Sequence, residues 1–208
     1  QFVGSMTIHR SRGARPIPIK FSVPPKASEG EQSCGQILLH LYIFDREPEA
    51  IGAMIQRANL QGYTKTEARN LLDDMIGIAI YRDRFRIRPY GNRDNDWLEL
   101  DKRRVQAPTM RIGQNQIMGL IVIEDEKRSH LVERSSREGL EENGSYYRLK
   151  ALVHALLTHV EPHRQSFRKG AGLSRPPSPN DLQKPLEAAE LSKIKEKIEE
   201  ITSYLPEK

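Results

Sequence analysis

The sequence predicts an α+β domain in which a mixed sheet packs against helices, with a further helix at the C-terminal end. The main observation is a change of apolar period along the chain. Segments that alternate with period two, or are apolar throughout, are separated by segments whose period is near 3.6 residues. The strands come first, then a helix, then more strands and a long helix, and this order favours a sheet covered by helices.

Five segments have the pattern of β-strands. The first alternates apolar and polar residues as a half-buried strand does, and the second is apolar enough for a central strand buried in part on both faces. The third and fourth flank Arg82-Asp83-Arg84 and predict a hairpin. The five segments are residues 17–23, 36–44, 78–81, 85–88 and 116–124.

Three segments have helical spacing. Glu67 to Met75 places its apolar residues on one side of a helix, with Thr66 as the N-cap. Residues 101–105 predict a short helical turn. Tyr146 to Val160 carries a continuous apolar stripe, and Pro162 is expected to end that helix.

Composition divides the chain into four parts. Residues 1–15 are polar and patternless and predict a tail, part of which resembles a cloning tag. Residues 16–163 predict one compact domain of average size. Residues 164–184 are rich in glycine, proline and serine and predict a linker. Residues 185–205 predict an amphipathic helix.

The C-terminal helix has two interpretations. Its apolar residues are three and four positions apart, and glutamate and lysine fill the positions between them. This spacing is that of a short coiled coil, which would join two copies of the chain, and equally that of a helix docked on its own domain. The apolar residues are Leu191, Ile194, Ile198, Ile201 and Leu205.

The overall composition excludes several protein classes. Cys34 is the only cysteine, so the chain cannot form an intrachain disulfide or a cysteine-rich zinc site. His159 and His163 have Pro162 between them and no evident third ligand, so no metal site is predicted. No apolar run approaches the ~20 residues of a membrane span, and no signal peptide is apparent at the start. We therefore expect a cytoplasmic protein without a membrane segment.

One polar segment has the residues for binding a phosphate. Ser136-Arg137-Glu138-Gly139-Leu140 lies between a predicted strand and the long helix, a place suited to a functional loop. A guanidinium beside the amide groups of a helix start can bind an anion. The alternative is that Arg137 pairs with a neighbouring glutamate such as Glu141 on the surface.

The order of several segments resembles a known family. Ser136 to Leu140 is similar to the catalytic-loop signature in the middle domain of the ninety-kilodalton heat-shock chaperone, where Ser-Arg-Glu-x-Leu opens a helix. The runs IYRDRFRIRPYG at 80–91 and DWLELDKRR at 96–104, followed by the strand at 111–119, resemble a bacterial group of chaperone-like ATPases. The resemblance covers residues 17–161.

This resemblance implies the middle (transducer) domain of an ATPase of the gyrase, heat-shock-chaperone, histidine-kinase and MutL superfamily. Arg137 matches the arginine that reaches the γ-phosphate of ATP held by the preceding domain. The chaperone's glutamine is replaced here by Glu141, whose charge would repel a phosphate, so that role does not carry over.

The nucleotide pocket of that superfamily is missing from the sequence. We find no catalytic glutamate helix, no aspartate-glycine adenine motif and no phosphate-binding P-loop. ATP and Mg²⁺ are therefore expected only through an ATP-binding domain upstream of this chain, and the chain alone is not expected to hydrolyse ATP.

A second candidate for phosphate contact precedes the last strand. The loop from Met110 to Gln116 combines a glycine with three amide side chains, and related ATPases use a loop of this domain as a switch. Arg111 and Gln114 are the residues that would contact the nucleotide. An ordinary polar turn is the alternative interpretation.

Four arginines at period two give a rival function. If they lie on a single strand, they share one face, and a row of guanidiniums suits a phosphate backbone. The net charge of +5 and a pI near 9.3 are compatible with a nucleic-acid partner. The alternatives to an ATPase transducer are thus a basic α+β module that binds nucleic acid and a structural domain that forms a homodimer. The four arginines are Arg82, Arg84, Arg86 and Arg88.

Overall fold

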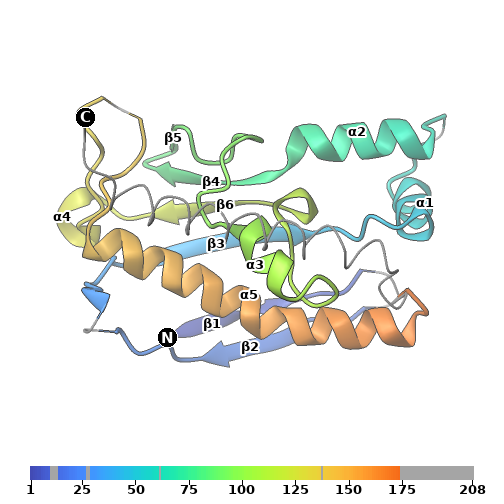
Figure 1. The fold of residues 1–208 in the computed structure, drawn as a ribbon, viewed down its shortest axis with the longest axis horizontal. Coiled ribbons are helices and arrows are strands. Elements are labelled where there is room, and N and C mark those ends of the chain that lie inside the picture. Colours follow the sequence, from blue (N-terminus) through green and yellow to red (C-terminus); the bar gives the residue numbers. More distant parts are fainter. Residues whose placement is uncertain (10–13, 27–28, 61, 137, 174–208) are drawn as a thin grey trace, which may run out of the picture.

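The computed structural model describes residues 1–9, 14–26, 29–60, 62–136 and 138–173. Within these residues the chain is an α+β structure built on a mixed four-stranded sheet, with a separate two-stranded ribbon and a long helix beside it (Figure 1). The strands are β1 (Phe2–Met6), β2 (Ile17–Phe21), β3 (Ile37–Ile43), β4 (Gly77–Arg82), β5 (Phe85–Ile87) and β6 (Ile117–Ile123). The helices are α1 (Pro48–Arg57), α2 (Lys65–Met75), α3 (Leu100–Gln106), the short 3-10 turn η2 (Gln114–Gln116), α4 (Glu126–Ser129) and α5 (Gly144–Gly170).

The four-stranded sheet has the order β3-β6-β4-β5. β6 pairs antiparallel with β3 and parallel with β4, and β4 pairs antiparallel with β5. The strand at 36–44 was predicted to be central, but β3 lies at an edge. The apolar β6 occupies the central position with neighbours on both sides.

The register divides the sheet residues between two faces. Side chains on one face belong to the main apolar core, which α5 and the 90–100 segment complete. We call this the covered face. Its residues are Ile37, Leu39, Leu41, Ile43, Ile78, Ile80, Ile87, Ile117, Ile121 and Ile123.

The opposite face contributes no residue to that core in the part of the chain that the structure describes. We call it the open face. Leu38 and Tyr42 on it are 56% and 55% exposed, although both are large apolar side chains. Its residues are Leu38, His40, Tyr42, Ala79, Tyr81, Arg86, Met118, Leu120 and Val122.

Helix α5 runs through Pro162, so the prediction that this proline ends the helix is wrong. Proline removes one backbone hydrogen bond but fits helical φ, and contacts beyond it can stabilise the following turns. Arg164 and Arg168 both donate to Asp45 Oδ1, at 2.7 and 2.6 Å, and Arg168 also pairs with Glu47. These ion pairs fasten the last two turns of α5 to the end of β3. Residues 164–170 of the predicted linker are therefore helical.

The N-terminal residues form a strand where a tail was predicted. β1 pairs with β2 over five residues, from Phe2 with Phe21 to Met6 with Ile17. Phe21 stacks between Phe2 and His159 of α5, with ring centroids 4.9 and 4.6 Å apart. Aromatic stacking and strand pairing together order a segment that has little hydrophobic pattern of its own.

Helix α1 was not predicted, and α2 begins two residues earlier than expected. The N-cap is Thr64, not Thr66: its hydroxyl accepts from the Glu67 N–H, and Glu67 Oε2 accepts from the Thr64 N–H at 2.7 Å. This reciprocal capping box outweighs a second threonine inside the helix. The predicted β4–β5 hairpin, α3 and β6 are confirmed within one or two residues.

None of the described helices is both long and apolar enough to cross a membrane. The remainder of the predicted linker, 174–184, and the predicted helix at 185–205 lie outside the described residues.

Candidate functional site

The Ser-Arg-Glu-Gly-Leu segment lies at the end of the sheet where β4 and β6 finish (Figure 1). It belongs to a closed loop, residues 133–140, which we call the Arg137 loop. Its base is an antiparallel bridge between Glu133 and Leu140, and the Arg134 N–H donates to the Gly139 carbonyl at 3.0 Å. Arg137 itself lies outside the described residues.

Arg82 holds one side of this loop. Its guanidinium donates to Glu133 Oε1 at 2.6 Å, to the Leu131 carbonyl, and to the Glu124 carbonyl at 3.3 Å. The side chain is only 12% exposed. Arg82 is therefore occupied by the protein, and its role here is to anchor the loop to β4.

Tyr90 holds the other side. The buried Leu140 N–H donates to Tyr90 Oη at 2.9 Å. Gly139 has a φ of +88°, and a Cβ there would lie 3.2 Å from Tyr90 Oη, so glycine suits both the backbone and the packing. Burial, and next the neighbouring Tyr90, raise the pKa of Tyr146 far above its usual value, so this ring stays neutral.

Replacing Tyr90 with phenylalanine is expected to destabilise the domain by about 1–3 kcal/mol, because the Leu140 N–H then has no acceptor in a buried position. Urea unfolding would measure the loss, and hydrogen exchange at the Leu140 amide would locate it. Tyr147→Phe is the matched control, since Tyr147 is 45% exposed. Equal stability of the two variants would contradict this role for Tyr90.

The tip of the Arg137 loop faces solvent. Ser135, Ser136 and Glu138 are exposed. Arg134, one of the two arginines of the loop, pairs with Glu142 at 3.2 Å. The contacts of the other, Arg137, lie outside the described residues. The tip is thus accessible to a group outside this domain.

The start of α5 is already capped. The Asn143 side chain accepts from the Ser145 and Tyr146 N–H groups at 3.1 and 3.0 Å. Amide donors of the first turn were expected to share an anion with Arg137, but these two are satisfied internally. An anion at the loop would therefore depend chiefly on guanidinium groups.

The predicted row of four arginines does not lie on one strand face. Asp83 and Arg84 form the two-residue hairpin turn, with φ of +47° and +69°, so the alternation restarts at Phe85. By the register, Arg82 shares the covered face with Ile80, whereas Arg86, opposite Tyr81, lies on the open face.

Three of these arginines remain at the surface, and we call Arg84, Arg86 and Arg88 the hairpin arginines. Arg86 donates to two neutral acceptors, the Tyr90 carbonyl at 2.9 Å and Asn92 Oδ1 at 2.7 Å. No carboxylate among the described residues pairs with any of the three. Since Pro89 and Tyr90 follow directly and contact Gly139, this positive hairpin adjoins the Arg137 loop.

Arg111 and Gln114 lie elsewhere. They precede β6 while the Arg137 loop follows it, and a seven-residue strand is ~23 Å long. Arg111 donates to Glu161 Oε2 at 2.6 Å, and the buried Gln114 side chain donates to the Arg93 carbonyl at 2.9 Å. Both side chains are engaged within the domain, and the structure does not bring them together with the Arg137 loop at one phosphate.

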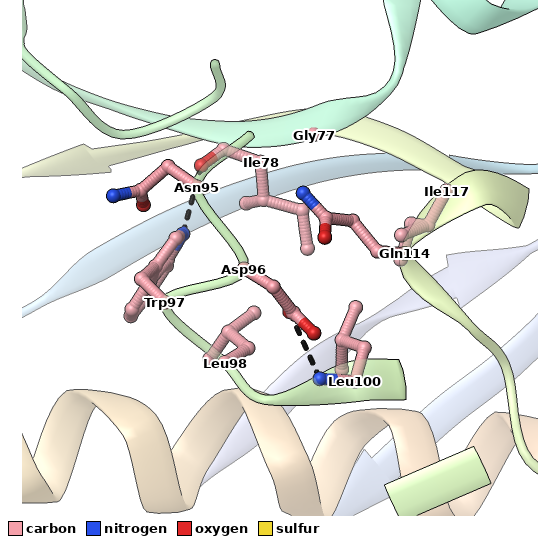
Figure 2. Close-up of a pocket in the computed structure, with 9 residues that line it drawn as sticks. All are labelled: Gly77, Ile78, Asn95, Asp96, Trp97, Leu98, Leu100, Gln114 and Ile117. Atoms are coloured by element: carbon pink, nitrogen blue, oxygen red, sulfur yellow. Dashed lines mark hydrogen bonds between the residues drawn. The ribbon is translucent and has the colours of Figure 1, made fainter. Parts of the chain in front are cut away.

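The pocket beside Gln114 is small (Figure 2). Its volume is about 10 Å³, roughly the space of one water. Trp97 Nε1 donates to the Ile78 carbonyl at 3.0 Å and Asp96 accepts from the Leu100 N–H at 2.9 Å, so its polar wall is largely satisfied. Within the described ranges of the chain, Asn95 Oδ1 has no hydrogen-bond donor, so it is free to accept from a water. The cavity is too small for a nucleotide.

A shallow groove lies between the end of β2 and α5. Phe21, Val23, His159 and Pro162 line it, without a glycine-rich loop or a cluster of charges. Among the described residues, no three His, Cys, Asp or Glu side chains are arranged to hold a metal ion.

Comparisons with known proteins assign neither a family nor a function. No protein-family model, curated protein or solved structure matches the chain. The function is therefore inferred from the residues and the fold.

Proposed function

We propose that the chain is the transducer domain of a chaperone-like ATPase, and that it supplies Arg137 to the γ-phosphate of ATP bound by an upstream domain. The ATP-binding domain would hold Mg²⁺ and perform the hydrolysis. The observation that carries the proposal is a loop clamped at its base by Arg82 and Tyr90, in which Ser136 and Glu138, the neighbours of Arg137 in the sequence, are exposed.

This arrangement suits an arginine that acts on another domain. A guanidinium stabilises the charge on a transferred phosphate only if it is positioned in advance, because reorganisation would cost part of the gain. The buried base gives that rigidity, and the exposed tip gives access. The hairpin arginines add positive charge beside the loop without a described carboxylate to neutralise it.

Helix α5 provides a route from this site to the rest of the domain. It begins four residues after the loop and runs for 27 residues, ~40 Å, to the ion pairs with Asp45 and Glu47. A displacement of the loop on ATP binding would move a rigid helix whose far end contacts the start of α1. The nucleotide state could be relayed in this way.

The test is ATP turnover by three proteins: the upstream domain alone, the upstream domain joined to this chain, and this chain alone. We expect the joined protein to be much faster than the upstream domain, and the chain alone to be inactive. Equal turnover by the first two proteins would overturn the proposal.

A nucleic-acid contact by the hairpin arginines is the second candidate, favoured by their exposure and lack of described carboxylate partners. Each lost phosphate contact reduces the salt slope of binding by about 0.9. The Arg84→Ala/Arg88→Ala double variant is therefore expected to bind duplex DNA with a slope lower by roughly 2.

The control is Arg57→Ala/Arg128→Ala, which removes the same charge from α1 and α4. Binding too weak to detect at low salt, or equal slopes for both double variants, would eliminate nucleic-acid binding by the hairpin.

A further inference from the structure

The open face of the sheet is apolar where a solvent-exposed face is usually polar. Tyr42, Met118, Leu120 and Val122 lie together on it, since Tyr42 is opposite Met118 and Val122 is opposite Leu38 in the register. The nine residues of the open face include no carboxylate and no lysine, and their one arginine, Arg86, lies on the edge strand β5. An apolar patch of this kind on a folded domain normally marks a binding surface.

The sequence of strand β6 also indicates that the open face is a binding surface. Its residues, Ile-Met-Gly-Leu-Ile-Val-Ile, are apolar on both faces. Strands with this composition occur where both faces of a sheet are covered. Among the described helices, α5 and α3 pack on the covered face, so the open face still needs an occupant.

We propose that the C-terminal segment of the same chain, residues 185–205, is that occupant and docks as an amphipathic helix across the open face. Leu191, Ile194, Ile198, Ile201 and Leu205 would form the buried stripe. A helix from 191 to 205 is ~22 Å long, and β3 and β6 have seven residues each, ~23 Å. The stripe and the face therefore match in length.

The described chain ends where such docking could begin. Arg168 donates to the Leu173 carbonyl at 3.2 Å and to Asp45 Oδ1 at 2.6 Å, so Leu173 lies beside the end of the edge strand β3. The 11 residues 174–184 can reach at most ~36 Å when extended. This reach is sufficient to pass the sheet edge and enter the open face.

The charges are complementary. Residues 185–205 contain three lysines and five glutamates, a net charge of −2. The open face is bordered by the hairpin arginines, of which Arg86 lies on the face itself. Glutamates flanking the apolar stripe would meet these guanidiniums at the rim, while the stripe covers Leu38, Tyr42 and Leu120.

Thiol labelling of the full chain tests this docking. Ile198→Cys and Glu196→Cys place a thiol on the apolar stripe and on the polar side of the same helix, and the buried Cys34 of the parent chain gives the background rate. We expect maleimide to react with the Ile198→Cys variant at least about tenfold more slowly than with the Glu196→Cys variant. A docked helix must first leave the sheet before a thiol at position 198 can react.

Substitution of the sheet face identifies the partner surface. Adding Leu38→Glu and Tyr42→Glu should restore fast labelling at position 198, whereas Leu71→Glu, at a leucine of α2 that is 39% exposed, should not. If the two glutamates impair folding, the Leu38→Ser/Tyr42→Ser variant replaces them in the same labelling experiment. Light scattering should show a monomer throughout.

Fast labelling of Ile198→Cys, protection that survives the face substitutions, or protection accompanied by a dimer would each overturn the proposal. The last result would indicate a coiled coil between two copies. Neither measurement involves ATP, so the inference stands or fails independently of the proposed ATPase role.

Discussion

Replacing Arg137 with alanine, in a protein that joins this chain to the proposed ATP-binding domain, is expected to reduce kcat by about 10²–10³-fold. The arginine would contact the γ-phosphate as charge develops in the transition state, so its loss should affect turnover far more than ATP binding. Steady-state kinetics would show a large fall in kcat with a small change in KM. Arg137→Lys should recover only part of the rate, since an ammonium cannot reproduce a bidentate contact.

Arg128→Ala is the control for this variant. Arg128 lies on α4, close to the loop in sequence. Its side chain is 73% exposed, and its ion-pair partners among the described residues are Glu124 and Asp125. It should leave kcat unchanged within about twofold, as an exposed ion pair contributes little. If Arg137→Ala turns over ATP as fast as Arg128→Ala, the arginine has no catalytic role.

Replacing Glu161 with leucine is expected to destabilise the chain by about 3–5 kcal/mol. Glu161 is completely buried on α5 and accepts from Arg111 at 2.6 Å and from the Ile112 N–H at 3.1 Å. Its removal leaves the partly buried Arg111 guanidinium without its carboxylate, with the Thr158 hydroxyl as the remaining acceptor, and leaves the buried Ile112 N–H without its acceptor. Arg103 Nη2 lies 3.7 Å from Glu161, so Arg103 would lose this ion pair as well, and its buried Nη1 already has no hydrogen-bond partner among the residues that the structure describes.

Urea unfolding of the 208-residue chain measures this loss, with Glu142→Leu as the control. Glu142 also pairs with an arginine, but its side chain is 58% exposed, so its replacement should change the free energy of unfolding by less than about 1 kcal/mol. Similar losses in the two variants would show that the Glu161 contacts are not a main support of the fold.

Local periodicity was sufficient for the elements whose own pattern of apolar residues identifies them. The β4–β5 hairpin and β6 lie within one residue or so of their predicted bounds, and the apolar stripe of α5 packs as expected. Predictions from local periodicity were wrong where contacts between residues far apart in the sequence determine the secondary structure. Helix α5 continues past Pro162 because Arg164 and Arg168 form ion pairs with Asp45, about 120 residues earlier in the sequence. β1 exists because Phe2 stacks on Phe21.

The candidate site was predicted in part. The sequence located the Arg137 loop between β6 and α5, and the α+β fold with a mixed sheet is confirmed. The predicted hairpin already placed Arg84 in the connection between two strands, and the structure follows the hairpin and not the row of four arginines. Periodicity could not show that Arg82 contacts Glu133, 51 residues later. Arg111 and Glu161 are equally far apart in the sequence, so no local pattern could predict the structural role of Arg111.

Binding of a transition-state analogue tests the central claim most directly. ADP with aluminium fluoride resembles the transferred phosphate, whereas a non-hydrolysable ATP analogue resembles the ground state. If Arg137 contacts that phosphate, Arg137→Ala should weaken binding of the first ligand to the joined protein by about the factor lost in kcat, ~10²-fold or more, with little effect on the second. Equal affinity of the parent protein and the variant for ADP with aluminium fluoride would contradict the account.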